Sequence, residues 1–420
     1  MASPEPDQPR TGSLFIIFLT VFIDLLGFGM VIPLLPIYAD SFTLDETGVV
    51  LGLLMASFSA MQFLFSPLWG RLSDRIGRRP VLLLGLGGSV LFYTLFGFAT
   101  VMKSLSLLFV ARIGAGIAGA TIATAQAYIA DSTTLEKRPK GMALIGMAFG
   151  MGFTFGPLFG FLAVPSEGAE PSPWPGYAAA LLSAAALALA FFRLPESLKP
   201  DSKPSEHAGL SLSAWRMALQ VPSIGQVLFA MFVCIFSFAN FETTLSLLIK
   251  GSKHAEQPLF DFSWAQVCLT FAYIGLTLSI VQGGIVRRLA GRFREGSLAA
   301  AGAFIELIGF GLTVFAVAYV SVELLFVALT AVVTGFAFMQ PNLQSLLSRR
   351  TDPAKQGLVL GVGQSVSSMA RILGAGISIP LLRRGAQVPY LTAAVLMTVG
   401  LILILLASRA GSDWKEESSR

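Results

Sequence analysis

The chain has 420 residues, of which 54% are hydrophobic and only 13% are charged, and its formal net charge is +5. Such a low charged fraction excludes a soluble globular protein, which would need far more charged surface at this length. The two cysteines and two histidines are too few and too scattered for a disulfide scaffold or a His-based metal site, so we expect no metal.

Apolar segments long enough to cross a bilayer follow one another along the whole chain. A helix needs about 20 residues to cross a hydrocarbon core of roughly 30 Å. Breaks at charged, proline and glycine clusters predict twelve spans, at 13–37, 47–68, 81–101, 105–130, 140–163, 174–193, 223–249, 264–286, 297–318, 322–349, 356–382 and 388–408. The first apolar run is too long for a signal peptide, so we expect it to be retained as a span. The pattern predicts an all-α membrane protein.

The distribution of lysine and arginine orients the predicted spans. Most of the 29 Lys and Arg residues fall in segments that are cytoplasmic if the N-terminus is cytoplasmic. The only long polar interruption, 194–222, is then a cytoplasmic linker between two six-span halves. We therefore expect both termini in the cytoplasm and this division: tail 1–12, bundle 13–193, linker 194–222, bundle 223–408 and tail 409–420.

Three motifs carry a family resemblance. The loop expected after the second span, Gly70–Pro80, has the spacing Gly-x-x-x-Asp-Arg-x-Gly-Arg-Arg, formed by Gly70, Asp74, Arg75, Gly77, Arg78 and Arg79. It resembles the signature between helices two and three of the major facilitator superfamily. Arg112 and the small residues after it resemble the helix-four motif of that family, and the fifth span resembles the motif of its drug:proton antiporters through Gly152, Gly156, Pro157 and Gly160. The resemblance implies twelve transmembrane helices in two pseudo-symmetric six-helix bundles.

Asp24 leads the candidate proton-coupling residues. It lies about 11 residues into the first span, roughly 16 Å deep. An ionised, unpaired carboxylate there costs several kcal/mol, and intramembrane acids are functional by default. Asp24 and the glycines and prolines after it also resemble the start of bacterial tetracycline and multidrug efflux pumps. The alternative is a structural hydrogen bond to a neighbouring helix.

Three more charged residues complete that set: Arg112, Glu242 and Glu306. Arg112 cannot lose its charge and must find a partner, with Asp24 a candidate. A purely structural charge pair is the alternative for Arg112, and an interfacial position for Glu242. Glu306 lies in the middle of the ninth span; if that span faces lipid, the acid is either neutral or paired.

A substrate cavity is predicted where polar and aromatic residues interrupt the apolar spans. Its candidate lining residues are Phe58, Gln62, Gln126, Phe238, Asn240, Glu242, Gln340, Asn342, Gln364 and Arg371. For the phenylalanines, contact with lipid is the alternative.

The remaining motif residues suggest conformational roles. By resemblance, Asp74 would face the start of the eleventh span near Gly357 and latch the cytoplasmic side, the alternative being a solvated turn. Glycines every four residues, at 152, 156 and 160, allow close backbone approach, and Pro157 removes a hydrogen bond. This contact either seals the periplasmic side or serves packing alone.

The resemblance implies a secondary transporter that exports hydrophobic or amphipathic organic compounds, of multidrug or tetracycline type, in exchange for protons. We expect it in the inner (plasma) membrane as a multi-pass monomer. Its partners would be a small-molecule substrate, protons and the lipid bilayer, with no nucleic acid and no cofactor beyond the proton gradient. No phosphate-binding loop or nucleophile–base constellation is present, which argues against an ATP-driven pump and an enzyme. A metabolite importer or facilitator of the same fold and a non-transporting membrane receptor remain alternatives.

Overall fold

A computed structural model describes residues 11–42, 47–133, 138–164, 170–198, 222–251, 259–289, 292–350 and 356–410. This part of the chain is almost entirely helical. Eleven of its helical segments are long and apolar enough to cross a membrane, and a shorter apolar stretch, Met147–Ala163, belongs to a twelfth long helix. The all-helical membrane architecture expected from the composition is thus confirmed for the described residues.

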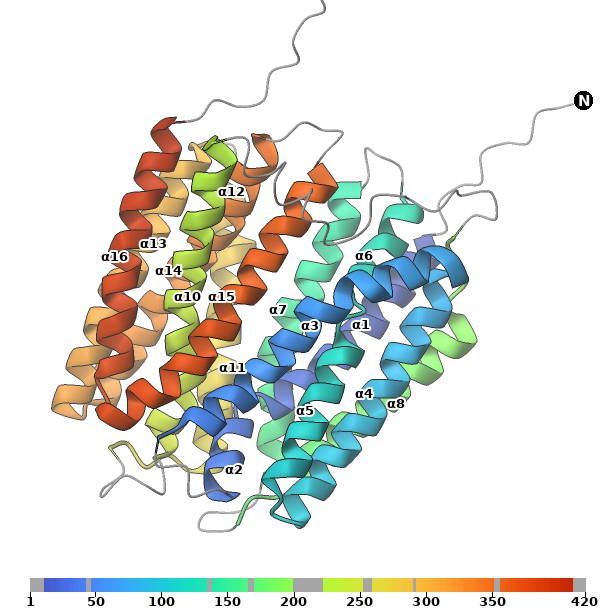
Figure 1. Ribbon diagram of the computed structural model, residues 1–420, viewed down its shortest axis with the longest axis horizontal. Helices are drawn as coiled ribbons and strands as arrows, with labels where there is room; N and C mark the ends of the chain where they lie inside the picture. Colours follow the sequence, from blue (N-terminus) through green and yellow to red (C-terminus); the bar gives the residue numbers. More distant parts are fainter. Residues whose placement is uncertain are drawn as a thin grey trace, which may run out of the picture.

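The first half of the chain forms eight helices. They are α1 Thr11–Val31, α2 Leu35–Phe42, α3 Val49–Ile76, α4 Arg78–Val101, α5 Leu105–Gly119, α6 Ile122–Asp131, α7 Arg138–Ala163 and α8 Trp174–Arg193. In Figure 1 these helices, coloured blue to green, lie together on one side of the molecule.

The helices of the second half, yellow to red, occupy the other side of Figure 1. They are α10 Pro222–Lys250, α11 Trp264–Ile280, the π-helix η1 Val281–Val286, α12 Arg287–Leu289, α13 Glu295–Tyr319, α14 Val322–Arg349, α15 Gln356–Arg384 and α16 Val388–Ala410.

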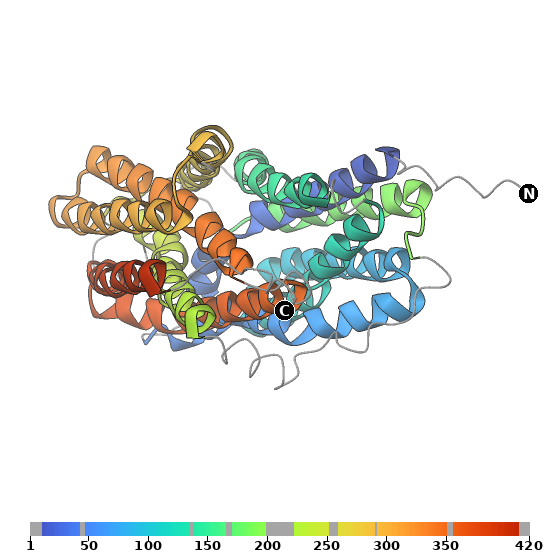
Figure 2. The same ribbon diagram turned by 90° about the horizontal axis from the view of Figure 1, so that it is seen from above.

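Packing is dense within each half and confined to a few helix pairs between them. In the first half, α1 packs on α7 and α8, and α4 on α5 and α8. In the second half, α10 packs on α15 and α16, and α13 on α14 and α16. The halves meet mainly through α3 against α15 and α7 against α11, as the view from above also indicates (Figure 2). The surface between the halves is therefore built mainly from these four helices, with a smaller contribution from α2.

Three predicted spans are interrupted rather than continuous. The first breaks at residues 32–34 around Pro33, which has no N–H to donate, and resumes as α2. The fourth breaks at Ala120 and Thr121, between α5 and α6. The eighth changes from α11 into the π-helix η1. Such π-insertions are rare and are frequently found at functional sites.

The predicted loop at 70–80 is wrong in one respect. Helix α3 continues to Ile76 and α4 begins at Arg78, so Gly77 alone separates them. Between Gly70 and Gly77 the sequence holds no glycine or proline to end the helix. Gly77 has φ 104° and ψ 157°, a conformation that residues with a side chain rarely adopt. The signature motif is therefore the last turns of one helix, a one-residue corner and the start of the next.

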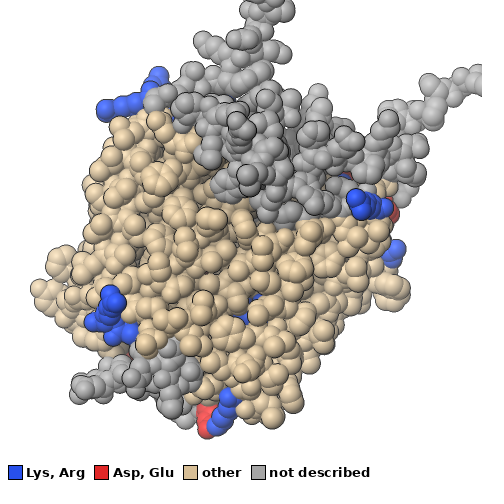
Figure 3. Space-filling model, viewed as in Figure 1, with Lys and Arg blue, Asp and Glu red and all other residues tan. Residues whose placement is uncertain are grey.

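The exterior is apolar around its middle. Large side chains such as Leu91, Leu181, Phe192 and Val395 are more than half exposed. The face in Figure 3 shows a broad band with almost no charged side chains, and the charges gather near the two ends. One end holds the start of α1 and the close of α16, and we call it the termini end; the other holds α2, and we call it the α2 end. An apolar belt between two charged rims is what a bilayer requires.

Candidate functional site

Asp24 lies within α1 and faces α8. Thirteen residues separate it from Thr11, or about 20 Å along the helix. The Ser183 hydroxyl of α8 donates a hydrogen bond of 2.8 Å to Asp24 Oδ1, and Ser89 of α4 is a second hydroxyl partner. Asp24 makes no ion pair in the described part of the chain. Its carboxyl group can therefore gain or lose a proton without breaking a salt bridge.

Arg112 has aromatic partners instead of Asp24. Its guanidinium carbon lies 4.4 Å from the ring centroid of Phe58 and 6.0 Å from that of Phe28. Phe28 in turn stacks on Phe58, with centroids 5.0 Å apart. Cation–π contacts of this kind are worth about 2 kcal/mol when desolvated. They help stabilise the charged form of Arg112, which is only 7% exposed. Tyr93 of α4 lies in electrostatic range of both Asp24 and Arg112.

Glu242 and Arg371 form an ion pair across α10 and α15. Arg371 Nη1 lies 2.6 Å from Glu242 Oε2. The Glu242 side chain is 30% exposed and the Arg371 side chain is 37% exposed. The pair is therefore neither sealed in the protein core nor fully solvated.

Glu306 is the most buried of the predicted acids. It has no exposed surface, and neither carboxylate oxygen has a hydrogen-bond partner within the described residues. Its Cβ lies against Gly335 of α14, where a methyl group added to Gly335 would approach it to 2.5 Å. The side chain thus points into the second half and away from lipid, and it is far in sequence from any of the other predicted acids.

The predicted cavity residues differ in how far their side chains are exposed. Gln126 and Gln364 are exposed, and Gln62 and Gln340 are half-buried. Asn240 and Asn342 are buried, and each amide nitrogen donates to the backbone carbonyl four residues earlier, of Phe236 and Phe338. Phe58 and Phe238 are also buried, Phe238 stacking on Phe336 with centroids 3.9 Å apart. Gln126, Gln364 and Arg371 are thus the members best presented to a ligand.

The signature motif is tied to the rest of its half. Arg78 Nε lies 2.9 Å from Asp131 Oδ2, and Arg78 Nη1 donates to Ser73 Oγ at 2.7 Å. Glu196 accepts hydrogen bonds from the backbone N–H groups of Arg78 and Arg79 and so caps α4. Arg75 is exposed. The side chain of Asp74 and the side chains next to Gly357 lie outside the described part of the structure. The latch between them therefore stays a prediction.

The glycines of α7 face α1. A methyl group on Gly156 would approach the Gly29 Cα to 2.6 Å, and one on Gly152 would approach Leu25 Cβ to 2.7 Å. Gly160 is looser, at 3.4 Å from Met30 O. Pro157 stays inside α7. The two helix backbones therefore touch at Gly152 and Gly156, within the first half rather than between the halves.

Replacement of Gly156 by alanine should destabilise the protein. Overpacking of a close contact costs about 1–3 kcal/mol. The matched Gly311→Ala in α13 meets nothing within 4 Å, and should be neutral or stabilising because alanine favours helix by up to about 1 kcal/mol. The midpoint of thermal unfolding should fall for purified Gly156→Ala and stay the same or rise for purified Gly311→Ala. Equal midpoints would contradict the close α1–α7 contact.

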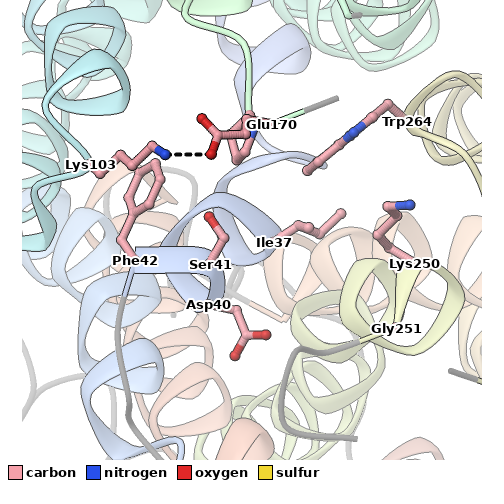
Figure 4. Close-up of a pocket in the computed structure, with 10 residues that line it drawn as sticks. Ile37, Asp40, Ser41, Phe42, Lys103, Glu170, Lys250, Gly251 and Trp264 are labelled. Carbon is pink, nitrogen blue, oxygen red and sulfur yellow. Dashed lines mark hydrogen bonds and ion pairs between the residues drawn. The ribbon is translucent and has the colours of Figure 1, made fainter. Parts of the chain in front are cut away.

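The halves are joined at the α2 end by a buried ion pair. Arg383, at the end of α15, pairs with Asp40 of α2, and the side chains are 11% and 3% exposed. Nearby, Tyr38 meets Trp264 edge to face with centroids 5.3 Å apart. Figure 4 shows the hollow beside them, of about 330 Å³, with Lys103 and Glu170 paired on one side and Lys250 and Trp264 on the other.

Sequence reasoning missed several partners. Ser89, Ser183 and Tyr93 surround Asp24, and Asp40 pairs with Arg383. Ser183 stands alone among alanines and leucines in its span, which is a usable signal, because a lone polar group in an apolar span needs a partner. Asp40 and Arg383 lie 343 residues apart, and nothing in the sequence places them together.

Comparison with known proteins agrees with this geometry. The profile of the Major Facilitator Superfamily matches residues 17–375. The tetracycline resistance protein, class C, of Escherichia coli is 31% identical over 409 residues, covering 97% of this chain and 98% of that protein. The human organic anion transporter MFSD10 (TETRAN) superposes with a TM-score of 0.72 at 27% identity, covering 95% of this chain and all of that one. A bacterial homologue of the human lysosomal transporter Spinster shares the fold, with a TM-score of 0.75 at 15% identity over 96% of this chain and 98% of that one.

Proposed function

Since this chain belongs to the Major Facilitator Superfamily, we propose that it is a proton-coupled exporter of hydrophobic or amphipathic organic compounds. It would work by alternating access between two six-helix bundles, with twelve spans and both termini in the cytoplasm. We place it in the inner (plasma) membrane as a monomer. The proton gradient is its energy source.

The observation that carries the proposal is the environment of Asp24. The carboxyl group lies deep in a span, hydrogen-bonded to hydroxyl groups and free of an ion pair within the described residues. A group placed this way can bind a proton from one side and release it to the other as the protein alternates. Arg112, the other proton-coupling candidate in this half, and Asp24 share Tyr93 as an electrostatic neighbour.

The substrate candidates come from the relatives. Tetracycline is the first, because of the class C relative, and organic anions are the second, because of the human transporter. A metabolite facilitator of the same fold would show uptake that is independent of a proton gradient. A receptor would bind ligand without transport.

Proteoliposomes with a trapped pH dye test the proposal. We expect tetracycline, or another member of a panel of drugs and organic anions, to cause proton flux when a pH gradient is imposed. The flux should depend on the compound and saturate with its concentration, because transport occurs at a defined site. Empty liposomes provide the control for passive drug permeation. Proton-independent uptake of a metabolite, with no drug-dependent flux, would replace export by facilitation.

A further inference from the structure

The Glu242–Arg371 ion pair sits at mid-depth in the second half. Arg371 follows Gln356 by 15 residues and precedes Arg384 by 13, so it is about 20 Å from either end of α15. A guanidinium exposed to hydrocarbon at this depth is costly and rare. The exposed third of the Arg371 side chain is therefore expected to face a water-filled interior.

The pattern of α15 supports that orientation. Met369, Leu373 and Ile377 are 41–45% exposed and recur every four residues, which defines an apolar, lipid-type face. At 100° per residue, Arg371 lies about 160° away from Leu373, on the other side of the helix. Gln364, seven residues before Arg371, shares its side and is exposed. This polar face of α15 thus presents a guanidinium and an amide toward the interior.

We propose that Arg371 binds the anionic group of an amphipathic organic anion, and that Glu242 occupies Arg371 until the anion displaces it. This inference rests on the proposed transport function and names the substrate class and its anchor. The Arg371 guanidinium cannot be neutralised, so it favours an anion, and its planar fork matches carboxylate or sulfonate. Phe238, one turn before Glu242 on α10, is buried; it stacks on Phe336 of α14 and is tilted against Phe241. Half-buried Phe236 of α10, which lies against Gly374 of α15, provides apolar surface for the body of the ligand.

Displacement leaves Glu242 without its counter-charge. The displaced carboxylate is best accommodated by binding one proton, so anion and proton bind together and the site stays neutral. No covalent bond changes. The proton on Glu242 then moves in the same direction as the substrate and opposes the gradient. The protons that drive export must therefore bind another carboxyl group, for which Asp24 is the candidate.

Other titratable groups on the helices around α10 have their own contacts. Tyr390 of α16 accepts a hydrogen bond from Thr244, Tyr273 of α11 bonds to Thr330, and Asp40 of α2 pairs with Arg383. Helix α14 carries no titratable side chain between Glu323 and Arg349. The others are Tyr38, Lys250, Cys268, Arg350, Arg384 and Arg409, together with Glu306 and Cys234. Cys234 and Lys250 each lie eight residues from Glu242 on α10. Arg371 is the charged partner of Glu242 in the described residues.

Two pyrene probes of opposite, permanent charge test the inference by binding alone. Pyrene-1-sulfonate and (pyrenylmethyl)trimethylammonium share an aromatic body and do not titrate. Binding to the full chain in nanodiscs is measured by equilibrium dialysis between pH 5 and 9, with empty nanodiscs as the blank. We expect the sulfonate to bind at least 10-fold more tightly than the ammonium, and its affinity to rise up to tenfold per unit fall in pH, as one coupled proton requires.

Variants assign the effect to the pair. Glu242→Gln should bind the sulfonate tightly at every pH, because Arg371 is no longer occupied. Arg371→Gln should lose the preference for the sulfonate, and Arg371→Lys should restore part of it. If the unpaired glutamate in Arg371→Gln prevents folding, the double variant Glu242→Gln/Arg371→Gln, which has no unpaired charge, gives the same comparison. Glu323→Gln, at the exposed end of α14, is the matched control and should keep the wild-type slope.

The outcomes separate this inference from the export proposal. Asp24→Asn should keep the sulfonate slope and lose gradient-driven export. The inference is overturned if the sulfonate fails to bind, binds no better than the ammonium, or keeps its pH slope in Glu242→Gln. Gradient-driven drug export that is indifferent to Arg371→Gln would also overturn it, while leaving the export function in place.

Discussion

Asp24→Asn should reduce gradient-driven export by about 100-fold or more, while exchange of substrate across the membrane at equal pH continues. Asparagine retains the oxygen that accepts the Ser183 hydroxyl at 2.8 Å, so the packing of α1 on α8 is preserved. It cannot bind or release a proton. A coupled transporter that loses its proton site can still alternate with substrate bound, but it has no energy source for net movement. The measurement compares proton flux and radiolabelled substrate exchange in the same proteoliposomes.

The controls for this prediction address the hydroxyl partners. Ser183→Ala removes a hydrogen bond but keeps the carboxyl group, and it should remain coupled. Asp24→Glu should also retain some coupling. Gradient-driven export that survives Asp24→Asn would transfer the coupled proton to Glu306, whose two oxygens lack a partner within the described residues. The same experiment on Glu306→Gln then decides between the two acids.

The membrane helices were largely predictable because hydropathy reports the environment of a span directly. A bilayer demands about 20 apolar residues and leaves few alternatives. The interruptions within the spans were harder to predict from the sequence. Pro33 signals a break in the first span. The π-helix at Val281–Val286 contains Gly283 and Gly284, and the break at Ala120 follows Gly119, but a glycine in an apolar span does not by itself predict an interruption. The corner at Gly77 was misjudged as a loop because charged residues mark a membrane boundary and not the end of a helix.

Site residues were predictable as types and not as pairs. An acid or arginine in an apolar span is conspicuous, so Asp24, Arg112, Glu242, Glu306 and Arg371 could all be named from the sequence. Their partners depend on how helices far apart in sequence pack together. Arg112 lies against Phe58 and not against Asp24, and Glu242 meets Arg371 from 129 residues away. The polarity of a residue predicts that it needs a partner, but only tertiary packing selects one.

The Asp40–Arg383 pair has the second large expected effect. It joins α2 to α15 where the halves meet, and the side chains are nearly buried, at 3% and 11% exposure. The α3–α15 contact continues beside it, since a methyl group on Gly52 would approach Gly376 O to 2.7 Å. Removing one partner of a buried pair costs about 3–5 kcal/mol when the other charge stays buried. Separation of the halves at the α2 end would let water reach Arg383, so Asp40→Asn should favour the form open at that end.

The two native cysteines report this opening without any engineered label. Cys268 of α11 lies near Gly160 of α7, at the boundary between the halves, whereas Cys234 of α10 packs against Gly400 of α16 inside the second half. Both are buried. A shift of 3 kcal/mol corresponds to about a 100-fold change in population. In Asp40→Asn, a membrane-impermeant maleimide should therefore modify Cys268 up to about 100-fold faster, with Cys234 unchanged, as followed by mass spectrometry of the peptides.

The exchanged variant Asp40→Arg/Arg383→Asp should restore slow modification, since it rebuilds the pair with its charges reversed. Equal acceleration at both cysteines would indicate general unfolding of the second half, and no acceleration at Cys268 would show that packing of α3 on α15 holds the α2 end closed without the ion pair.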